Sequence, residues 1–296
     1  MPADARMLLP GPIKALLRGP YYFLKGVTGL RTLKRDYKSR YGPEFVFEID
    51  NDDVMFRYYK FQWCRGIPDV ASRLLYLQAT ETLLTDVEDI LDRSGVTLPQ
   101  VGSFLDFACG HGRLTRFLVH RLSRNRITVS DINKEAVDFV CRTFGVKGFY
   151  SVGTPEKLSH DGYYDVIFVG SLFSHLPVTI WASWLSRLYG MLSKNGVLVF
   201  STHGMDLYKQ IAPAERQRLE TDTEGFFYGE VTFGGGGILP PTIYGTTYVS
   251  DSYVRQVVKS RALGNLIGFY PKGLSQLQDV YVIRDQASES KKQVAS

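Results

Sequence analysis

The 296 residues, of which 44% are apolar, can bury a sizeable core, so they predict a globular protein of one elaborated domain or of one domain with a smaller appendage. The net charge of +5 permits an anionic partner without requiring one. Three scattered cysteines without metal-ligand spacing argue against a disulfide framework or a zinc site and favour a reducing cytoplasm, and no apolar run reaches the roughly 20 residues of a membrane-spanning helix.

Residues 1–70 are predicted to form a helical, aromatic N-terminal arm whose first part is basic. Within residues 13–40, leucines and aromatic residues alternate with Lys and Arg, a composition compatible with peripheral contact with an anionic membrane. A solvated helical face that packs on the core through its aromatic side chains explains the same pattern. The aromatic residues within 50–63 would either cover a bound sulfonium by cation–π contact, as part of a lid, or belong to the core.

From about residue 68 the pattern changes to alternating helices and strands. We expect helices over 72–95, 112–123, 133–145 and 179–192, and strands over 103–107, 126–131, 148–152, 164–171 and 196–203. Short β-branched strands that alternate with helices predict an α/β fold with a doubly wound parallel sheet.

The region after His203 reads as about 45 irregular residues, including "FGGGGILPP", which would be a mobile hinge or a plain flexible loop. A helix from about Asp251 and two strands, "NLIGFY" and "QDVYVIRD", are expected to follow. The polar residues 286–296 are predicted to be a disordered tail.

The stretch "DFACGHGR" follows the first predicted strand and places two glycines one residue apart. In an open parallel sheet, ligands bind beyond the carboxyl ends of the strands, where the strand order reverses. Asp106, Asp131, the stretch "GSLFSH" and His203 each end a predicted strand. These polar groups are therefore expected to lie on one rim of the sheet.

Two common nucleotide sites do not fit this glycine turn. A nicotinamide site would need a third glycine where Thr115 stands, and the carboxylate of Asp106 would repel a pyrophosphate. A phosphate-binding loop would need a Lys-Ser or Lys-Thr pair where Arg113 and Leu114 stand. S-adenosyl-L-methionine (SAM) fits better, because it carries an ammonium, a sulfonium and a ribose diol but no phosphate.

The motifs "LDFACGHGR", "VSDIN" and "YDVIFVGSLFSHLP" resemble those of class I SAM-dependent methyltransferases, most of all a bacterial branch that acts on small molecules or glycans. The resemblance covers about residues 91–204 and extends more loosely to "QDVYVIRD". It implies a Rossmann-like, seven-stranded sheet, mostly parallel with an antiparallel closing strand. It also implies a methyltransferase domain over residues 71–285, with a substrate-covering insertion over 206–249.

The same resemblance implies a SAM site built from strand ends and turns. Asp106 would lie near the methionine amino group, Asp131 would accept hydrogen bonds from the ribose hydroxyls, and Ile132 would pack on the adenine. The other implied cofactor-binding residues are Ala108, Cys109, Gly110, Gly112, Gly153, Thr154, Ser171 and Leu172. Because Gly153 and Thr154 stand where relatives often carry an acidic residue or an amide, adenine recognition here would depend on backbone groups. The alternative is that both aspartates are ordinary helix caps, which does not account for the two glycines.

Methyl transfer to a hydroxyl benefits from a general base, and His175 and His203 are the candidates on the rim. Either histidine would alternatively hydrogen-bond a loop. Tyr244 and Tyr248 would line the acceptor site or pack the insertion. Ser171 stands where metal-dependent relatives carry an aspartate, so no metal is implied.

The predicted function is methyl transfer to a hydroxyl, less readily an amine, of a small molecule, glycan or glycolipid. A nucleic acid partner is not expected, because the motif of base-methylating relatives is replaced by "GSLFSH". The alternative is a non-catalytic SAM-binding assembly partner. The expected location is the cytoplasm, with membrane contact through residues 13–40 as a further possibility.

Overall fold

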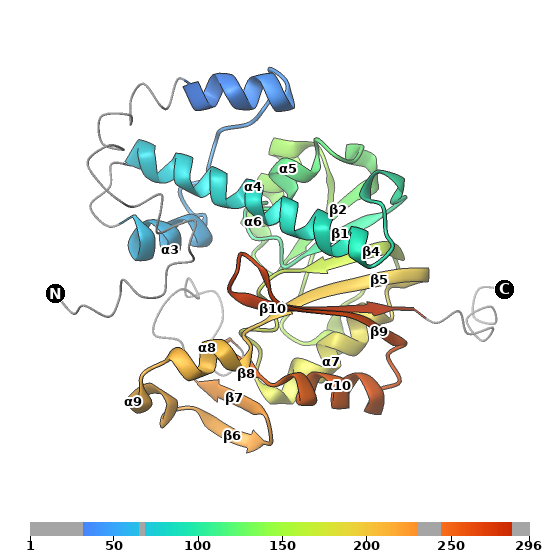
Figure 1. Cartoon of the computed structure of the whole chain (residues 1–296). Helices are drawn as coiled ribbons and strands as arrows, with labels where there is room; N and C mark the ends of the chain where they lie inside the picture. Colours follow the sequence, from blue (N-terminus) through green and yellow to red (C-terminus); the bar gives the residue numbers. More distant parts are fainter. Residues whose placement is uncertain (1–31, 65–68, 230–243, 286–296) are drawn as a thin grey trace.

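The structure is a computed structural model that describes residues 32–64, 69–229 and 244–285. Its centre is a seven-stranded sheet in the order β3-β2-β1-β4-β5-β10-β9 (Figure 1). The strands are β1 (Phe104–Phe107), β2 (Ile127–Asp131), β3 (Lys147–Tyr150), β4 (Tyr164–Val169), β5 (Leu192–Thr202), β9 (Asn265–Leu274) and β10 (Gln278–Arg284). Strands β1 to β5 pair in parallel, whereas β10 runs antiparallel to both of its neighbours. The predicted Rossmann-like fold is thus confirmed, and the strand order reverses between β1 and β4.

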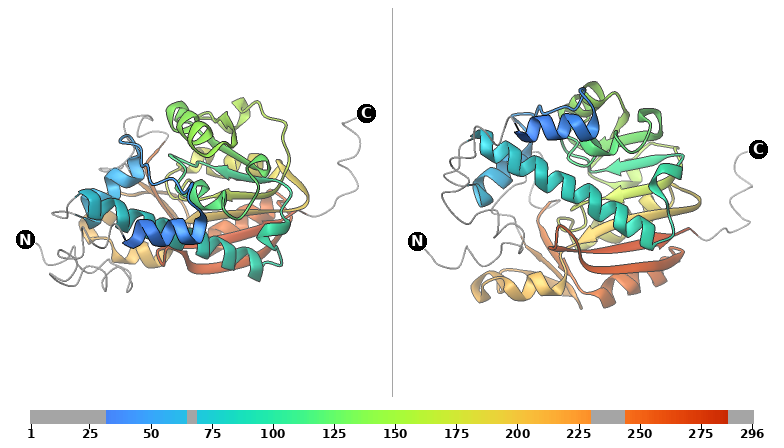
Figure 2. Two further views of the ribbon diagram at one scale, coloured as in Figure 1. Left: turned by 90° about the horizontal axis from the view of Figure 1, so that it is seen from above. Right: turned by 45° about the horizontal axis from the view of Figure 1, so that its top comes forward.

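Helices cover both faces of this sheet (Figures 1 and 2). The helices of the sheet layers are α4 (Asp69–Arg93), α5 (Thr115–Leu118), α6 (Lys134–Phe144), α7 (Val178–Tyr189) and α10 (Asp251–Ser260). Alternate residues of β4 belong to two separate cores: Val166 packs with the residues of α4, α5 and α6, and Ile167 packs with those of α7 and α10. This alternation follows from the period of two of a strand, because both faces of a doubly wound sheet are buried.

The helix expected over 112–123 is much shorter in the structure, where α5 begins only at Thr115 and ends at Leu118. Gly110 and Gly112 both have positive φ values, so the chain stays in a turn before the helix can begin. By contrast, α6 begins and ends at the predicted residues. The side chain of Asn133 accepts from Ala136 N–H at its N-terminus, and Gly145 ends it in the left-handed conformation.

The described part of the N-terminal arm packs on the domain. It consists of a helix over residues 32–41, a connecting segment and α3 (Val54–Trp63). Tyr37 is fully buried and contacts the rings of Phe45 and Phe117, and Arg40 forms an ion pair with Asp36 on its exposed side. Tyr37, Phe45, Phe56 and Tyr59 therefore belong to the core, whereas Tyr58 and Phe61 are exposed. Residues 1–31, which carry most of the predicted membrane contact, lie outside the described residues.

The insertion is not the irregular segment that the sequence suggested. It contains α8 (Met205–Gln210), α9 (Pro213–Arg216) and a small antiparallel sheet of β6 (Glu220–Thr223), β7 (Phe226–Gly229) and β8 (Thr246–Val249). Phe226 and Val249 are buried in the same core as α7 and α10. Figures 1 and 2 show this small sheet on the same side of the molecule as α3. The predicted glycine hinge, within residues 230–243, and the tail, residues 286–296, lie outside the described residues.

Strand β8 is attached to the rim of the large sheet by main-chain hydrogen bonds. Thr247 N–H donates to the carbonyl oxygen of Ser174 at 2.8 Å, and Val249 N–H donates to that of His203 at 2.9 Å. The hydroxyl of Thr247 also donates to the carbonyl oxygen of Leu176 at 2.6 Å. The insertion is therefore continuous with the sheet that carries the predicted site. Within the described ranges, no helix is long and apolar enough to cross a membrane.

Candidate active site

The structure places the predicted polar residues along the carboxyl ends of β1, β2, β4 and β5. Asp106 lies within β1 and Asp131 ends β2, while Ser171 is the second residue after β4 and His203 directly follows β5. The crevice at a reversal of strand order is where α/β proteins of this architecture bind their ligands. In the part of the chain that the structure describes, no three His, Cys, Asp or Glu residues are grouped so that they could hold a metal ion.

The turn after β1 has three residues with positive φ: Ala108 at 60°, Gly110 at 51° and Gly112 at 74°. A methyl group at Gly112 would lie 2.9 Å from side-chain atoms of both Val140 and Phe144 on α6, whereas one at Gly110 would meet no atom within 4 Å. Gly112 therefore allows the turn to pack closely on α6. Gly110 leaves open space beside the turn.

These two glycines give a matched pair of stability predictions. Gly112→Ala should lower the free energy of unfolding by about 2–4 kcal/mol, because it adds a left-handed backbone cost to an overpacking cost. Gly110→Ala should cost only the backbone part, about 1–2 kcal/mol. Urea denaturation of both variants measures the difference. Equal losses would mean that α6 shifts to accept the methyl group.

Asp131 connects the turn to the end of β2. Its carboxylate accepts Gly110 N–H on Oδ2 and Asn133 N–H on Oδ1, each at 2.8 Å. Burial raises the pKa of Asp131, and these two donors oppose that shift. Asn133 is the N-cap of α6, and Leu114 occupies that position for α5. Neither Asp131 nor Asp106 is therefore the N-cap residue of the helix that follows it.

Asp106 is almost completely buried, with 3% of its surface exposed. Thr115, at the position where a nicotinamide site would have a third glycine, donates its hydroxyl to Asp106 Oδ2 at 2.7 Å. Burial, and after it the nearby charge of Asp131, raises the pKa of Asp106 to about 7, although the Thr115 bond opposes the shift. The Asp106 carboxyl can thus change its charge near neutral pH.

The other predicted cofactor-binding residues differ in their burial, their hydrogen bonds and the open space beside them. The Cys109 side chain belongs to the core, and its thiol donates to the carbonyl oxygen of Gly110 at 3.3 Å. A side chain at Gly153 would meet no atom within 4 Å, and Thr154 precedes the short helix η4 (Pro155–Lys157) without capping it. The remaining two, Ile132 and Leu172, are half-buried.

His175 has a defined tautomer. Its Nδ1 lies 2.7 Å from the carbonyl oxygen of Gly245, which can only accept, so Nδ1 carries the proton and Nε2 keeps its lone pair. The ring stacks on Tyr244 with 4.5 Å between the ring centroids. Burial lowers the pKa of His175 to about 4, which keeps it neutral at physiological pH.

His203 lies beside it, with 5.9 Å between the two imidazole centroids and 5.3 Å from His203 to the ring of Tyr248. Burial, followed by the proximity of His175, lowers the pKa of His203 to about 3. The two predicted base candidates are thus brought together as a neutral pair. Each neutral ring has one lone pair that can accept a proton, and the low pKa values make both rings weaker bases than a free imidazole.

Two further residues at this rim were missed by the sequence analysis. Gln278 is the first residue of β10, and Ser201 lies near the end of β5. The Ser201 hydroxyl lies 2.6 Å from Gln278 Oε1, and Gln278 Nε2 lies 3.4 Å from His203 Nε2. The antiparallel direction of the closing strand, β10, could have pointed to Gln278 from the sequence. Because β10 is antiparallel, its first residue lies where the parallel strands end.

Aromatic rings extend from the histidine pair into the insertion. Tyr248 on β8 contacts Tyr208 on α8 at 5.8 Å, and Tyr208 stacks on Phe227 of β7 at 4.2 Å. Burial, followed by the charge of Glu215 and the nearby Tyr58 hydroxyl, raises the pKa of Tyr248 to about 12. We call Tyr244, His175, His203, Tyr248, Tyr208 and Phe227 the aromatic ladder. It presents uncharged rings next to the rim.

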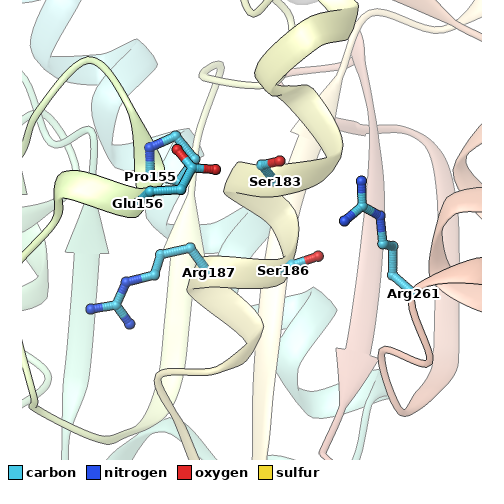
Figure 3. Close-up of a pocket in the computed structure, with 6 residues that line it drawn as sticks. All are labelled: Pro155, Glu156, Ser183, Ser186, Arg187 and Arg261. Carbon is cyan, nitrogen blue, oxygen red and sulfur yellow. The ribbon is translucent and has the colours of Figure 1, made fainter.

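A separate cavity of about 320 Å³ lies between η4, α7 and the residue that follows α10 (Figure 3). It is lined by Pro155, Glu156, Ser183, Ser186, Arg187 and Arg261. The Arg187 guanidinium already donates to the carbonyl oxygens of Leu158 and His160, at 3.1 and 2.8 Å. None of the predicted site residues lines this cavity, so it is not the predicted site.

Comparison with known proteins finds a matching family model and solved structures of similar fold. Residues 105–198 match the family described as a methyltransferase domain. The solved structure of a SAM-dependent methyltransferase from Clostridium acetobutylicum is similar to this chain with a TM-score of 0.52 and 13% identity, over 78% of this chain and 97% of that one. This likeness shows a shared fold.

Two further solved structures are similar at lower scores. Magnesium protoporphyrin IX methyltransferase from Synechocystis has a TM-score of 0.49 and 15% identity, over 86% of this chain and all (100%) of that one. The N-methyltransferase NodS from Bradyrhizobium japonicum has a TM-score of 0.44 and 13% identity, over 80% and 99%. No curated protein sequence matches the chain.

Residues 105–198 therefore match a methyltransferase domain, and the chain shares the fold of a SAM-dependent methyltransferase. The residues at the rim fit S-adenosylmethionine. Two carboxylates, Asp106 and Asp131, suit a cationic molecule without phosphate, and the open space beside Gly110 and Gly153 lets a ligand approach the backbone.

Proposed function

We propose that the chain methylates a hydroxyl group of a small molecule or glycan, with His175 or His203 as the general base. The observation that carries this proposal is the neutral histidine pair at the rim, in which His175 keeps its proton on Nδ1 and its lone pair on Nε2. When bound, the cofactor supplies an electrophilic methyl group that the acceptor oxygen attacks as the carbon–sulfur bond breaks, leaving the electron pair on sulfur. The hydroxyl proton passes to His175 Nε2, or to His203 in the second version. Such a base contributes about 10²- to 10⁴-fold in rate.

We also propose the roles of the residues that hold the cofactor. The Asp131 carboxylate accepts hydrogen bonds from the ribose hydroxyls, and the ionised Asp106 carboxylate pairs with the methionine ammonium. Gly110 and Gly112 shape the turn that lies along the ligand, and Ala108 and the Cys109 main chain continue it. Ile132, Gly153, Thr154, Ser171 and Leu172 complete the site. Positioning of the two reactants contributes about 7–11 kcal/mol to such transfers.

The acceptor site is proposed to lie between the insertion, residues 206–249, and the arm. The aromatic ladder supports this proposal from the insertion, and Tyr58 on α3 supports it from the arm because it lies near enough to Tyr248 to affect its pKa. Uncharged rings favour an acceptor with an apolar face, such as a sugar ring or an aromatic or amphiphilic group. Contact of residues 13–40 with an anionic membrane remains part of the proposal for an amphiphilic acceptor.

Calorimetric titration of the purified chain with SAM, S-adenosylhomocysteine and NADH tests the cofactor, and transfer of labelled methyl to hydroxyl and amine acceptors tests the reaction. We expect micromolar binding of the first two ligands only, and transfer to a hydroxyl. Binding of SAM without transfer to any acceptor would favour the non-catalytic alternative, and transfer to an amine would overturn the proposed acceptor atom.

The buried Asp106 carboxyl predicts a pH dependence of cofactor binding. Because burial raises the pKa of Asp106 to about 7, the carboxyl is largely protonated at pH 5.5, and its deprotonation must accompany pairing with an ammonium group. The affinity for SAM should therefore rise as the pH increases from about 5.5 to 7, by up to about tenfold per pH unit. Asp106→Asn should remove most of this dependence. An equally steep dependence in that variant would assign the titration to another group.

A further inference from the structure

We propose that Gln278 is a positioning residue that holds the His203 ring with its proton on Nδ1 and its Nε2 lone pair facing the Gln278 amide. The role is conferred by the network of Ser171, Ser201, Gln278 and His203 at the carboxyl edge of the sheet. The inference rests on the proposed function, because it concerns the neighbour of the proposed base His175.

The network fixes the orientation of the Gln278 amide. Ser171 N–H donates to the Ser201 hydroxyl oxygen at 2.8 Å, so the hydroxyl proton of Ser201 remains available for another acceptor. That acceptor is Gln278 Oε1, at 2.6 Å. The Ser171 hydroxyl lies near both ends of the amide, 3.2 Å from Oε1 and 3.0 Å from Nε2, so the Ser201 bond decides the orientation: its 2.6 Å length suits an O–H···O bond and is short for N–H···O. With its oxygen turned toward Ser201, the amide presents Nε2 to His203 Nε2, at 3.4 Å. An amide nitrogen can only donate.

The orientation of the amide decides the tautomer of His203. A donor that faces Nε2 requires a lone pair there, so the ring proton lies on Nδ1. His203 Nδ1 is buried without a partner at full hydrogen-bond geometry among the described residues, although the main chain of Thr247 interacts with the ring and raises its pKa. The Gln278 amide opposes a move of the proton to Nε2, because two N–H donors would then face each other.

The titratable groups around His203 bear on which of the two histidines receives the proton. His175, which follows β4, lies 5.9 Å away, and Tyr248 of β8 lies 5.3 Å away; Tyr248 itself responds to Glu215 of α9 and to Tyr58 of α3. No carboxylate acts directly on the pKa of His203. A protonated His203 would repel a proton arriving at His175. Burial keeps His203 neutral, and the Gln278 amide occupies its Nε2 lone pair, so His175 is the group left to receive the proton.

Nitrogen-15 NMR of histidine in the full chain tests the inference without any acceptor. In the wild type, His203 should show a protonated Nδ1 and an unprotonated Nε2 from pH 8 down to about 5. Gln278→Glu replaces the donor by a carboxylate, which favours the imidazolium, so the pKa of His203 should rise toward neutrality. Gln278→Leu should let the ring proton move to Nε2. Gln276→Glu adds the same charge at an exposed residue two positions away and should leave the His203 signals unchanged.

A wild-type His203 with its proton on Nε2 would overturn the inference, as would an unchanged titration in Gln278→Glu. In a transfer assay, Gln278→Leu should lower kcat with the KM for SAM unchanged, and Gln278→Glu should move the acidic limb of the kcat profile to higher pH. The NMR result holds even if no methyl transfer is ever detected. Failure of the proposed function and failure of this inference are therefore distinguishable.

Discussion

His175→Asn will lower kcat for hydroxyl methylation by about 10²- to 10⁴-fold, the range that a general base contributes, and will leave the affinity for SAM unchanged. The asparagine amide can still donate to the carbonyl oxygen of Gly245, as His175 Nδ1 does at 2.7 Å, but it cannot accept a proton. The loss should therefore appear in the chemical step. Single-turnover transfer of labelled methyl measures that step, and calorimetry measures the affinity.

His160→Asn is the matched control for that variant. His160 stacks on Phe149 and hydrogen-bonds Tyr164, which is the first residue of β4, so it lies at the opposite edge of the sheet from the rim. Its substitution should change stability and leave kcat nearly unaltered. If His175→Asn keeps full activity while His203→Asn loses it, the base is His203. If both retain full activity, the reaction proceeds without a histidine base.

Asp131→Ala will weaken SAM binding by about 100-fold or more, because two hydrogen bonds to a charged group contribute at least about 1.5 kcal/mol each and 1.4 kcal/mol corresponds to a factor of ten. The same substitution frees Gly110 N–H and Asn133 N–H, which the carboxylate now accepts at 2.8 Å, so the turn also loses its link to β2. Calorimetric titration measures the affinity. Asp138→Ala, at an exposed carboxylate on α6 that accepts from Tyr150, is the control and should bind SAM normally.

A pair of ligands separates the proposed roles of the two buried aspartates. S-adenosylhomocysteine carries the methionine amino group and the ribose, whereas 5′-methylthioadenosine keeps only the ribose and the base. Asp131→Ala should weaken both ligands by similar factors, and Asp106→Asn should weaken only S-adenosylhomocysteine. The reverse pattern would contradict the proposed placement of the ligand along the rim.

The sheet could be predicted from the sequence because each of its strands is a short apolar or β-branched run flanked by a turn, and burial on both faces follows from that composition. The strands of the insertion escaped prediction because they are short and partly polar. Hydrogen bonds from Thr247 and Val249 to the rim, rather than local preference, place β8. Helix α5 was overestimated at both ends: two glycines hold a turn open before it, and after Leu118 the chain continues in turns that include bonds three residues apart.

The candidate site could be located because Asp106, Asp131 and His203 each stand at or near the end of a strand. The hydrogen bonds within the site could not be predicted from the sequence. The role of Thr115 depends on the depth at which Asp106 is buried, and that of Gln278 depends on the direction of β10. The proton position on His175 depends on a carbonyl oxygen 70 residues away in the chain.

The attachment of β8 to the rim has a consequence for how acceptor preference can change in evolution or design. The residues that line the proposed acceptor site share hydrogen bonds with the segment that carries His175, and Phe226 and Val249 share a core with α7 and α10. Replacing the whole insertion would therefore also break hydrogen bonds and core contacts of the methyltransferase-like sheet. Single substitutions of aromatic-ladder side chains leave the β8 backbone bonds intact, so we expect them to change acceptor preference with the least loss of stability.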